Sequence, residues 1–170
     1  SQKTIHKLLV ANRGEISIRI FRAATELKIR TVAVFTHEDR YSLHRYKADE
    51  SYQIGAENEP LKPYLDIEEI ISLAKRVGAD AIHPGYGFLS ENVGFAKRCE
   101  KEGIIFVGPK SDVMEQLGDK IAAKKIARKA KVPVIEGAEI HTDDVRKRKS
   151  FARKIGVPVM LKAAAGGGGG

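Results

Sequence analysis

Short apolar runs recur along the first two thirds of the chain, and most of them are followed by a stretch with helical spacing. The first run, residues 7–11, is apolar at almost every position and lacks the polar alternation of a sheet with one face in water. Further short runs, several of them β-branched, follow along the chain. The pattern predicts five strands, at residues 7–11, 31–35, 51–54, 80–83 and 104–107, of which the first is expected to be buried.

Between these runs the apolar positions change to a helical period. The first such stretch predicts a helix with one apolar face, made of Ile16, Ile20, Ala23, Ala24 and Leu27. A second helix is predicted after Asp66, its expected N-cap, and a third over residues 90–102, with Ser90 as its cap. This alternation predicts an α/β fold, in which an open, Rossmann-like parallel sheet carries helices on both faces and has right-handed connections.

After Pro109 the pattern becomes mainly helical, so we expect a boundary between two domains within residues 109–133. The breaks in the pattern fall at glycine, proline and aspartate positions, which are typical ends and starts of helices. The predicted order is one or two helices over 110–130 broken near Gly118, an extended segment from Val132, a helix from Asp143 or Asp144 to Ile155, and a strand over 157–163.

Three loops of unusual composition follow predicted strands, at residues 12–15, 83–87 and 108–109. Ligands of open parallel sheets bind at the loops beyond the carboxyl ends of the strands. The second loop continues to Asn92 and forms a tight turn, and its His83, Tyr86 and Glu91 are candidates to line a site. For Tyr86 and Phe88, a loop that packs one domain against another is at least as good an interpretation.

The chain ends with Lys162, three alanines and five glycines after the last predicted strand. Glycines free backbone N–H groups to surround a phosphate, and a lysine adds a compact positive charge. The run does not follow the Walker pattern, the dinucleotide fingerprint is missing after the first strand, and a flexible linker explains the glycines equally well. Lys120, after Asp119 as the predicted N-cap, is a second phosphate candidate, although an ordinary first-turn lysine is the simpler interpretation.

Positive charge is concentrated in the last third of the chain. Residues 1–109 hold 16 Lys and Arg against 15 Asp and Glu, whereas residues 110–170 hold 14 against 7. A polyanionic ligand such as ATP would account for this excess, and so would a solvated, lysine-rich helix around residues 146–149. No recognised nucleic-acid-binding module accompanies the charge, so we expect no nucleic-acid partner.

The composition is that of a soluble protein, with 42% hydrophobic and 31% charged residues. No apolar run approaches bilayer length, so no membrane partner is expected. Cys99 cannot form an internal disulfide, and it falls in a helical pattern where burial in a reducing compartment is expected. No metal site is predicted, because ligand spacing is missing around the histidines His6, His37, His44 and His141.

Six segments resemble biotin carboxylases in content, order and spacing, and together they extend over essentially the whole chain. They are the run LVANRGEI at 9–16, KADE at 47–50, HPGYGFLSEN at 83–92, FVGP at 106–109, GDK at 118–120, and Lys162 with its glycines. Residues 42–52 and 64–68 are more similar to the pyruvate carboxylase branch of this family. Acetyl-CoA and propionyl-CoA carboxylases share much of the same region.

The resemblance implies a three-part ATP-grasp enzyme. Residues 1–108 would be its N-terminal α/β domain, residues 109–133 connecting helices, and residues 134–170 the start of a lid over ATP. In this family ATP phosphorylates bicarbonate to carboxyphosphate, whose CO2 is passed to biotin on a carrier domain, and the pyruvate branch then makes oxaloacetate. The implied cofactors are ATP, Mg2+ and biotin, and a cytoplasmic or mitochondrial-matrix location follows.

The resemblance also assigns roles to individual positions. Lys120 and Lys162 match the nucleotide-contacting lysines of the family, and the lid loop over the phosphates is matched by Gly166, Gly167, Gly168 and Gly169. Positions at the dimer contact are matched by Arg19, Arg22 and Glu26, for which a solvated helix face is an equally good interpretation.

Gly170 stands where the family has a basic residue, and the metal-binding glutamates, the bicarbonate site and the biotin-facing arginine are expected beyond it. We therefore expect no catalytic residue in this chain, and no carboxylase or bicarbonate-dependent ATPase activity from the chain alone. Another ATP-grasp ligase and a non-catalytic dimerising module are the alternatives.

Overall fold

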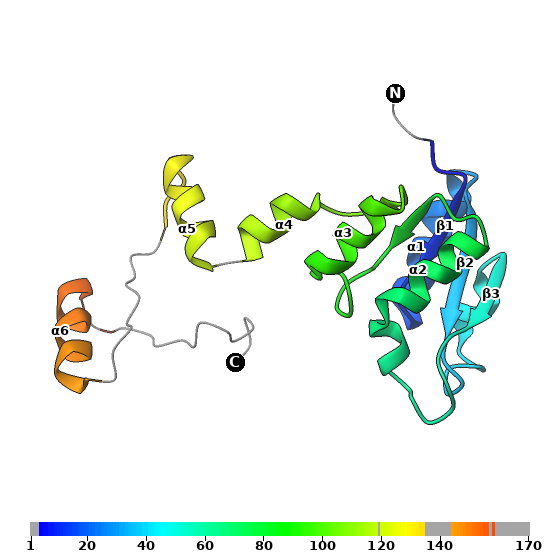
Figure 1. The fold of residues 1–170 in the computed structure, drawn as a ribbon, viewed down its shortest axis with the longest axis horizontal. Helices are drawn as coiled ribbons and strands as arrows, with labels where there is room; N and C mark the ends of the chain where they lie inside the picture. The colour runs from blue at the N-terminus through cyan, green and yellow to red at the C-terminus, as the bar shows by residue number, and fades with distance from the viewer. Residues whose placement is uncertain (1–3, 119, 135–143, 157, 159–170) are drawn as a thin grey trace. The chain divides into compact units, whose positions relative to one another are not determined.

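The computed structural model describes residues 4–118, 120–134, 144–156 and 158 (Figure 1). Internal contacts divide the chain into two units, residues 1–115 and 116–170. The division falls inside helix α4 (Ser111–Gly118). Each unit is described by itself below.

The first unit is built on a sheet of five strands, all parallel. In chain order they are β1 (Lys7–Val10), β2 (Arg30–Phe35), β3 (Glu50–Gln53), β4 (Ala81–His83) and β5 (Ile105–Phe106). Their spatial order is β3-β2-β1-β4-β5, so the chain switches direction across the sheet between β1 and β4. The predicted open parallel sheet is confirmed, and every strand ends within one residue of its predicted position.

Helices cover both faces of this sheet (Figure 1). Helices α2 (Ile67–Arg76) and α3 (Val93–Lys101) cover one face, where their side chains join Leu9 in the larger core. Helix α1 (Gly14–Glu26) covers part of the other face, where Phe21 and Ala24 pack against Leu8, Val10 and Ala33. Successive residues of β1 therefore serve opposite cores, as strand geometry requires. Two short 3-10 helices, η1 (Leu43–Lys47) and η2 (Lys62–Leu65), lie in the connections around β3.

The predicted apolar face of the first helix is confirmed only in part, because Ala24 is buried and Ile20 packs against the smaller core. The fully buried residues of this helix are Ser17, Phe21 and Ala24, whereas Leu27 at the end of the expected stripe is 73% exposed. Ala23 is exposed and Ile20 is half-buried. The helix carries apolar residues on two adjacent faces, and the sequence pattern alone could not tell which of them meets the sheet.

One predicted helix cap is confirmed and one is wrong. The Asp66 carboxylate accepts a hydrogen bond from the backbone N–H of Glu69 at 2.9 Å, as expected of an N-cap. Helix α3 is capped by Asn92, whose Oδ1 accepts from the N–H of Phe95, and not by Ser90. The backbone N–H of Ser90 donates to Gly87 O in a turn, which delays the helix to Val93.

Cys99 is fully buried on α3, as expected. Burial raises the pKa of its thiol to about 12, so the thiolate is essentially unpopulated near neutral pH. This cysteine therefore acts as a small apolar core residue.

Helices α5 (Lys120–Lys129) and α6 (Val145–Ile155) belong to the second unit. Helix α4 ends at Gly118, where the break was predicted, and α5 begins at Lys120. The Asp144 carboxylate caps α6 by accepting from the N–H of Arg146 at 2.8 Å, which selects Asp144 over Asp143. The predicted cap at Asp119 and the predicted strand over 157–163 lie outside the described residues, apart from Pro158.

Candidate functional site

The loops that follow β1 and β4 meet at the carboxyl edge of the sheet, joined by the side chain of Asn12. Its Nδ2 donates to the carbonyls of Pro84 and Tyr86, at 2.7 and 2.8 Å, and its Oδ1 accepts from the N–H of Arg13. Asn12 is 3% exposed, and its bond to Pro84 is fully buried. The amide thus fixes two of the three predicted loops relative to each other, at the place where the strand order switches.

Backbone geometry in the second loop depends on its glycines. Gly85 has φ +66°, and a Cβ there would lie 2.6 Å from Nδ2 of Asn12. Any larger residue at position 85 would both strain the backbone and break the junction between the loops. Phe88 has φ +41°, a left-handed conformation that costs a residue with a side chain about 1–3 kcal/mol.

A buried carboxylate lies beside the first loop. Both oxygens of Asp39 are paired with the Arg13 guanidinium, and the carboxylate also accepts from the hydroxyls of Tyr64 at 2.7 Å and Ser42 at 2.9 Å. The Asp39 side chain is 5% exposed. We call these four residues the Asp39 cluster.

Electrostatics keep Asp39 ionised despite its burial. Burial alone raises the pKa of this carboxyl, but the hydrogen bonds from Arg13, Tyr64 and Ser42 together outweigh it and lower the pKa to about 2. Burial and the neighbouring Asp39 carboxylate raise the pKa of Tyr64 well above its usual range. Near neutral pH the cluster therefore contains a carboxylate, a guanidinium and a neutral phenol.

The Asp39 cluster reaches the second loop through an aromatic contact. The ring of Tyr64 stacks on Phe88 with centroids 5.2 Å apart and an interplanar angle of 25°. This contact lies within the first unit, so the packing of Phe88 against another domain stays a prediction. Asp39 and Tyr64 are not among the site residues predicted from the sequence, although Asp39 lies in the loop that follows a predicted strand.

The three candidate side chains of the second loop have different settings. Tyr86 is 62% exposed and donates its hydroxyl to Glu15 at 3.1 Å, and its packing against another domain stays a prediction. His83 is half-buried, its Nδ1 accepts from the N–H of Gly85, and burial lowers its pKa. Glu91 is exposed. His83 is thus a neutral hydrogen-bonding group near neutral pH, and Tyr86 and Glu91 face water in the described structure.

The third loop, at Gly108 and Pro109, is anchored elsewhere. Just beyond it, the N–H and hydroxyl of Ser111 donate to the Glu100 carboxylate at 3.0 and 2.8 Å, which ties the chain to the end of α3. The Asn12 side chain, by contrast, joins the first two loops directly.

The predicted nucleotide residues remain predictions. Lys120 is the first residue of α5, but its side chain lies outside the described part of the structure. Lys162 and the glycines at 166–169 also lie outside it. Within the described residues, no group of three or more His, Cys, Asp or Glu side chains could hold a metal ion.

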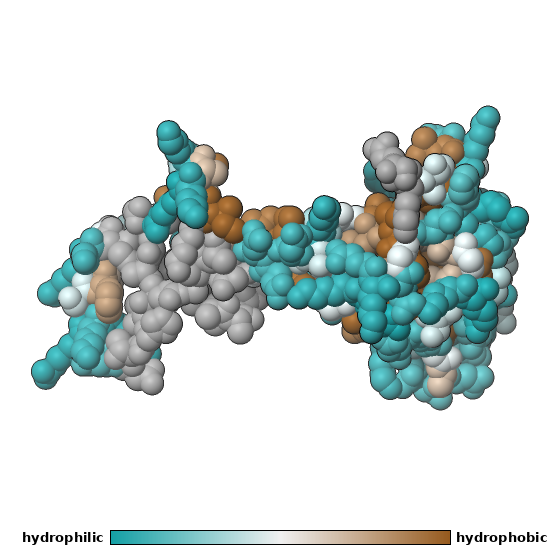
Figure 2. Space-filling view, turned by 45° about the horizontal axis from the view of Figure 1, so that its top comes forward, coloured by the Kyte–Doolittle hydropathy of each residue, from teal (hydrophilic) through white to brown (hydrophobic). Residues whose placement is uncertain are grey.

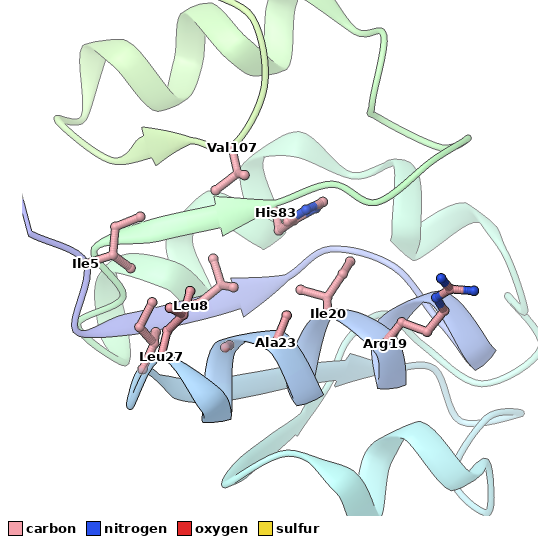
Figure 3. Close-up of a pocket in the computed structure, with 10 residues that line it drawn as sticks. Ile5, Leu8, Arg19, Ile20, Ala23, Leu27, His83 and Val107 are labelled. Atoms are coloured by element: carbon pink, nitrogen blue, oxygen red, sulfur yellow. The ribbon is translucent and has the colours of Figure 1, made fainter.

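An apolar groove of about 330 Å³ runs between α1 and the strands β1 and β4 (Figure 3). Its walls include Ile20, Ala23 and Leu27, three residues of the predicted apolar stripe, of which Ile20 also packs against the smaller core. Leu8 and Val107 line the opposite side, and Arg19 and His83 also border the groove (Figure 3). Hydrophobic atoms reach the otherwise largely hydrophilic surface of the first unit in Figure 2.

Arg19, Arg22 and Glu26 lie together on α1, as expected from their spacing. With Glu15, Ile18 and Ala23 they line a second, shallow hollow. All three are exposed.

Comparison with protein families identifies this architecture. The family described as "Biotin carboxylase, N-terminal domain" matches residues 4–114, which include the whole sheet and both joined loops. The chain belongs to the biotin carboxylase family. Residues 119–170 of this biotin carboxylase chain match a second family, "Carbamoyl-phosphate synthase L chain, ATP binding domain".

Curated relatives are similar over nearly the full chain. A pyruvate carboxylase of Bacillus subtilis is 57% identical over 99% of the chain, and one of Staphylococcus aureus is 56% identical over 98%. Mitochondrial pyruvate carboxylase of mouse is 50% identical over 98%. The chain spans 14–15% of the length of these relatives.

Solved structures agree with this assignment. Rhizobium etli pyruvate carboxylase, crystallised with the allosteric activator acetyl coenzyme A, matches 98% of the chain at 54% identity and a TM-score of 0.87, over 15% of its own length. The biotin carboxylase domain dimer of Hydrogenobacter thermophilus 2-oxoglutarate carboxylase, in complex with MgADP and bicarbonate, matches 99% at 49% identity and a TM-score of 0.90, over 37% of that chain. Among the described residues, no helix is long and apolar enough to cross a membrane.

Proposed function

We propose that this chain is the N-terminal part of the biotin carboxylase domain of a pyruvate carboxylase. The complete enzyme would use ATP to activate bicarbonate, carboxylate biotin on a carrier domain, and pass the carboxyl group to pyruvate to give oxaloacetate. The observation that carries this proposal is the 57% identity to a pyruvate carboxylase over 99% of the chain. A 2-oxoglutarate acceptor is the second candidate, since the biotin carboxylase domain of a 2-oxoglutarate carboxylase is 49% identical over the same span.

The proposed division of the chain is an α/β domain at 1–108, connecting helices at 109–133 and the start of an ATP-grasp lid at 134–170. The change from sheet to isolated helices after β5, and the family matches that end at 114 and begin at 119, support a boundary in this region.

Nucleotide binding is assigned to Lys120, Lys162 and the glycines at 166–169. The start of α5 at Lys120 supports the first of these, because the positive end of the helix dipole would add to the lysine charge facing a phosphate. Such fixed positive charge stabilises a phosphoryl group during transfer.

The exposed surface of α1 supports contacts with a second copy of the protein and with the rest of a biotin carboxylase domain. Arg19, Arg22 and Glu26 are the candidate contacts of a homodimer, a state named for the domain of the H. thermophilus relative. The apolar groove beside them is suited to burial by the rest of a biotin carboxylase domain, of which this chain is about a third by the length of solved relatives. A mitochondrial or cytoplasmic location is proposed from the same relatives.

Carboxylation assays test the proposal. The full-length protein is expected to fix labelled bicarbonate into pyruvate in the presence of MgATP, and to prefer pyruvate over 2-oxoglutarate, acetyl-CoA and propionyl-CoA. Equal or greater fixation into another acceptor would overturn the pyruvate assignment, and no bicarbonate-dependent ATP cleavage would overturn the biotin carboxylase function.

The 170-residue chain alone is expected to show no bicarbonate-dependent ATP cleavage above a Lys120→Ala control. Calorimetric titration with MgATP and sedimentation of the same chain separate partial nucleotide binding from a purely dimerising role. Heat of binding that is lost in the Lys120→Ala variant supports the nucleotide assignment, whereas dimers without any heat favour the assembly role.

A further inference from the structure

We propose that Asp39 and Tyr64 are positioning residues, which hold the loop of residues 83–92 in the conformation that carboxylation requires. The inference rests on the proposed function, because it assigns a use in that reaction to the loop at the switch point of the sheet. It is carried by a closed ring of contacts that joins four segments far apart in the sequence.

One half of the ring is polar and starts at the first loop. The guanidinium of Arg13 pairs with both oxygens of Asp39, and the hydroxyl of Tyr64 donates to the same carboxylate at 2.7 Å. Charge-assisted and bidentate hydrogen bonds of this kind fix orientation as well as distance. The position of the Tyr64 ring is therefore set from the carboxyl ends of β1 and β2.

The next contact is aromatic and reaches the second loop. Tyr64 is fully buried, and its ring stacks on Phe88 at a centroid separation of 5.2 Å. Phe88 has a left-handed backbone, which a residue with a side chain keeps only where the surroundings impose it. The stack supplies that constraint, so the conformation of the loop depends on where Tyr64 lies.

Asn12 completes the ring from the other side. Its Nδ2 holds the carbonyls of Pro84 and Tyr86, and its own orientation is set by the N–H of Arg13 on Oδ1. Arg13 therefore acts twice, through its backbone on Asn12 and through its side chain on Asp39. Asn12 therefore holds the loop at residues 84 and 86, and the ring of Tyr64 holds it at residue 88.

Asp39 and Tyr64 are suited to positioning rather than to contact with substrate. The Asp39 side chain is 5% exposed, and Arg13, Tyr64 and Ser42 already supply four hydrogen bonds to it. The exposed side chains of the assembly include Arg13, which is 43% exposed, and Tyr86, which is 62% exposed at the tip of the loop that the cluster supports. Asp39 and Tyr64 thus act through the loop and not on a reacting group.

Two substitutions in the full-length protein test the inference, each with a matched control. Tyr64→Phe keeps the stack and removes the hydroxyl, and Tyr52→Phe removes another tyrosine hydroxyl that donates to a carboxylate, Glu50, on the edge strand β3. Asp39→Asn removes the buried charge, and Asp49→Asn removes a carboxylate that accepts from Thr31. The measurements are steady-state kinetics of bicarbonate-dependent ATP cleavage and hydrogen exchange of the peptide containing residues 83–92.

We expect kcat to fall about 10-fold in Asp39→Asn and about 3-fold in Tyr64→Phe, with an unchanged KM for MgATP. Hydrogen exchange in residues 83–92 should accelerate in the same two variants at temperatures where all four are folded. Both controls should stay within about 2-fold of the wild type in kcat, with unchanged exchange in this loop. If Asp39→Asn and Tyr64→Phe lower stability but leave both kcat and the rate of hydrogen exchange in residues 83–92 unchanged, the two residues have a merely structural role and the inference is overturned.

The outcomes remain separable if a variant or the proposed function fails. If Asp39→Asn does not fold, the milder Tyr64→Phe is compared with its control, Tyr52→Phe. Equal kcat and equal loop exchange in these two variants would reject the inference. If the wild-type protein shows no bicarbonate-dependent ATP cleavage, the proposed function is wrong, and with it the use of the loop in carboxylation. Loop exchange would then still decide whether the Asp39 cluster holds residues 83–92.

Discussion

The two faces of the sheet are covered differently. On the face of α2 and α3, Leu9 is fully buried in a continuous core with helix residues such as Ile70 and Phe95. On the face of α1, Leu27 is 73% exposed along a groove, although it belongs to the same kind of apolar stripe. Hydrophobic periodicity therefore shows where a helix has apolar surface, but packing against the rest of the protein decides which part of that surface is buried.

The largest expected effect comes from the filled face. Leu9→Ala should lower the free energy of unfolding by about 2–5 kcal/mol, because it opens a cavity in the larger core next to the central strand. Urea unfolding of the chain measures this loss. A loss below about 1 kcal/mol would mean that this face is no better packed than the other.

The next effect concerns the Asp39 cluster, and it depends on pH. The folded-state pKa of Asp39, about 2, lies below its usual value of 3.8, so its stabilising contribution is complete above about pH 4 and is lost as the pH falls toward 2. This contribution is on the order of 1–2 kcal/mol, and it should disappear in Asp39→Asn. Acid unfolding curves of the wild type and of Asp39→Asn should therefore converge near pH 2, and parallel curves would contradict the assignment.

A smaller effect is expected at the cap of α2. Asp66→Ala removes the hydrogen bond to the N–H of Glu69 and should cost about 1 kcal/mol. Ser72→Ala, at an exposed position of the same helix, is the matched control and should change stability by less than about 0.5 kcal/mol. Thermal unfolding of both variants checks this difference, and equal melting temperatures would show that the cap is not stabilising.

The smallest effect belongs to the open face. Leu27→Ala removes the same atoms as Leu9→Ala but should change the stability of the chain alone by less than about 0.5 kcal/mol, because Leu27 is already in water. In the full-length protein the same substitution should lower the melting temperature, if the groove is covered there as proposed. An equal and small effect in both settings would argue that the groove stays open.

The central strands β1 and β2 could be predicted from the sequence because they are buried along most of their length and read as nearly continuous apolar runs, whereas β3 is polar and only partly buried. The caps could be predicted only in part: Asp66 has a single plausible helix to start, whereas Ser90 and Asn92 compete for one start, and the turn at Gly87 decides for Asn92. The candidate loops were found because they follow strands. The meeting of the side chains of residues 13, 39, 64 and 88 could not be predicted, because these residues are far apart in the sequence and their contacts depend on the tertiary fold.

The central position of β1 in the sheet leaves one of its edges unpaired while the chain is being synthesised. Its Lys7 pairs with Arg30 of β2, which leaves the ribosome soon afterwards, but its other edge pairs with Ala81 to His83 of β4, which are synthesised much later. Until then, a growing chain that has formed β1, β2 and β3 presents the unpaired edge of its most apolar strand to its neighbours. Strand edges of this kind invite pairing between chains, so synthesis up to β4 is the interval in which the nascent protein depends most on protection from aggregation.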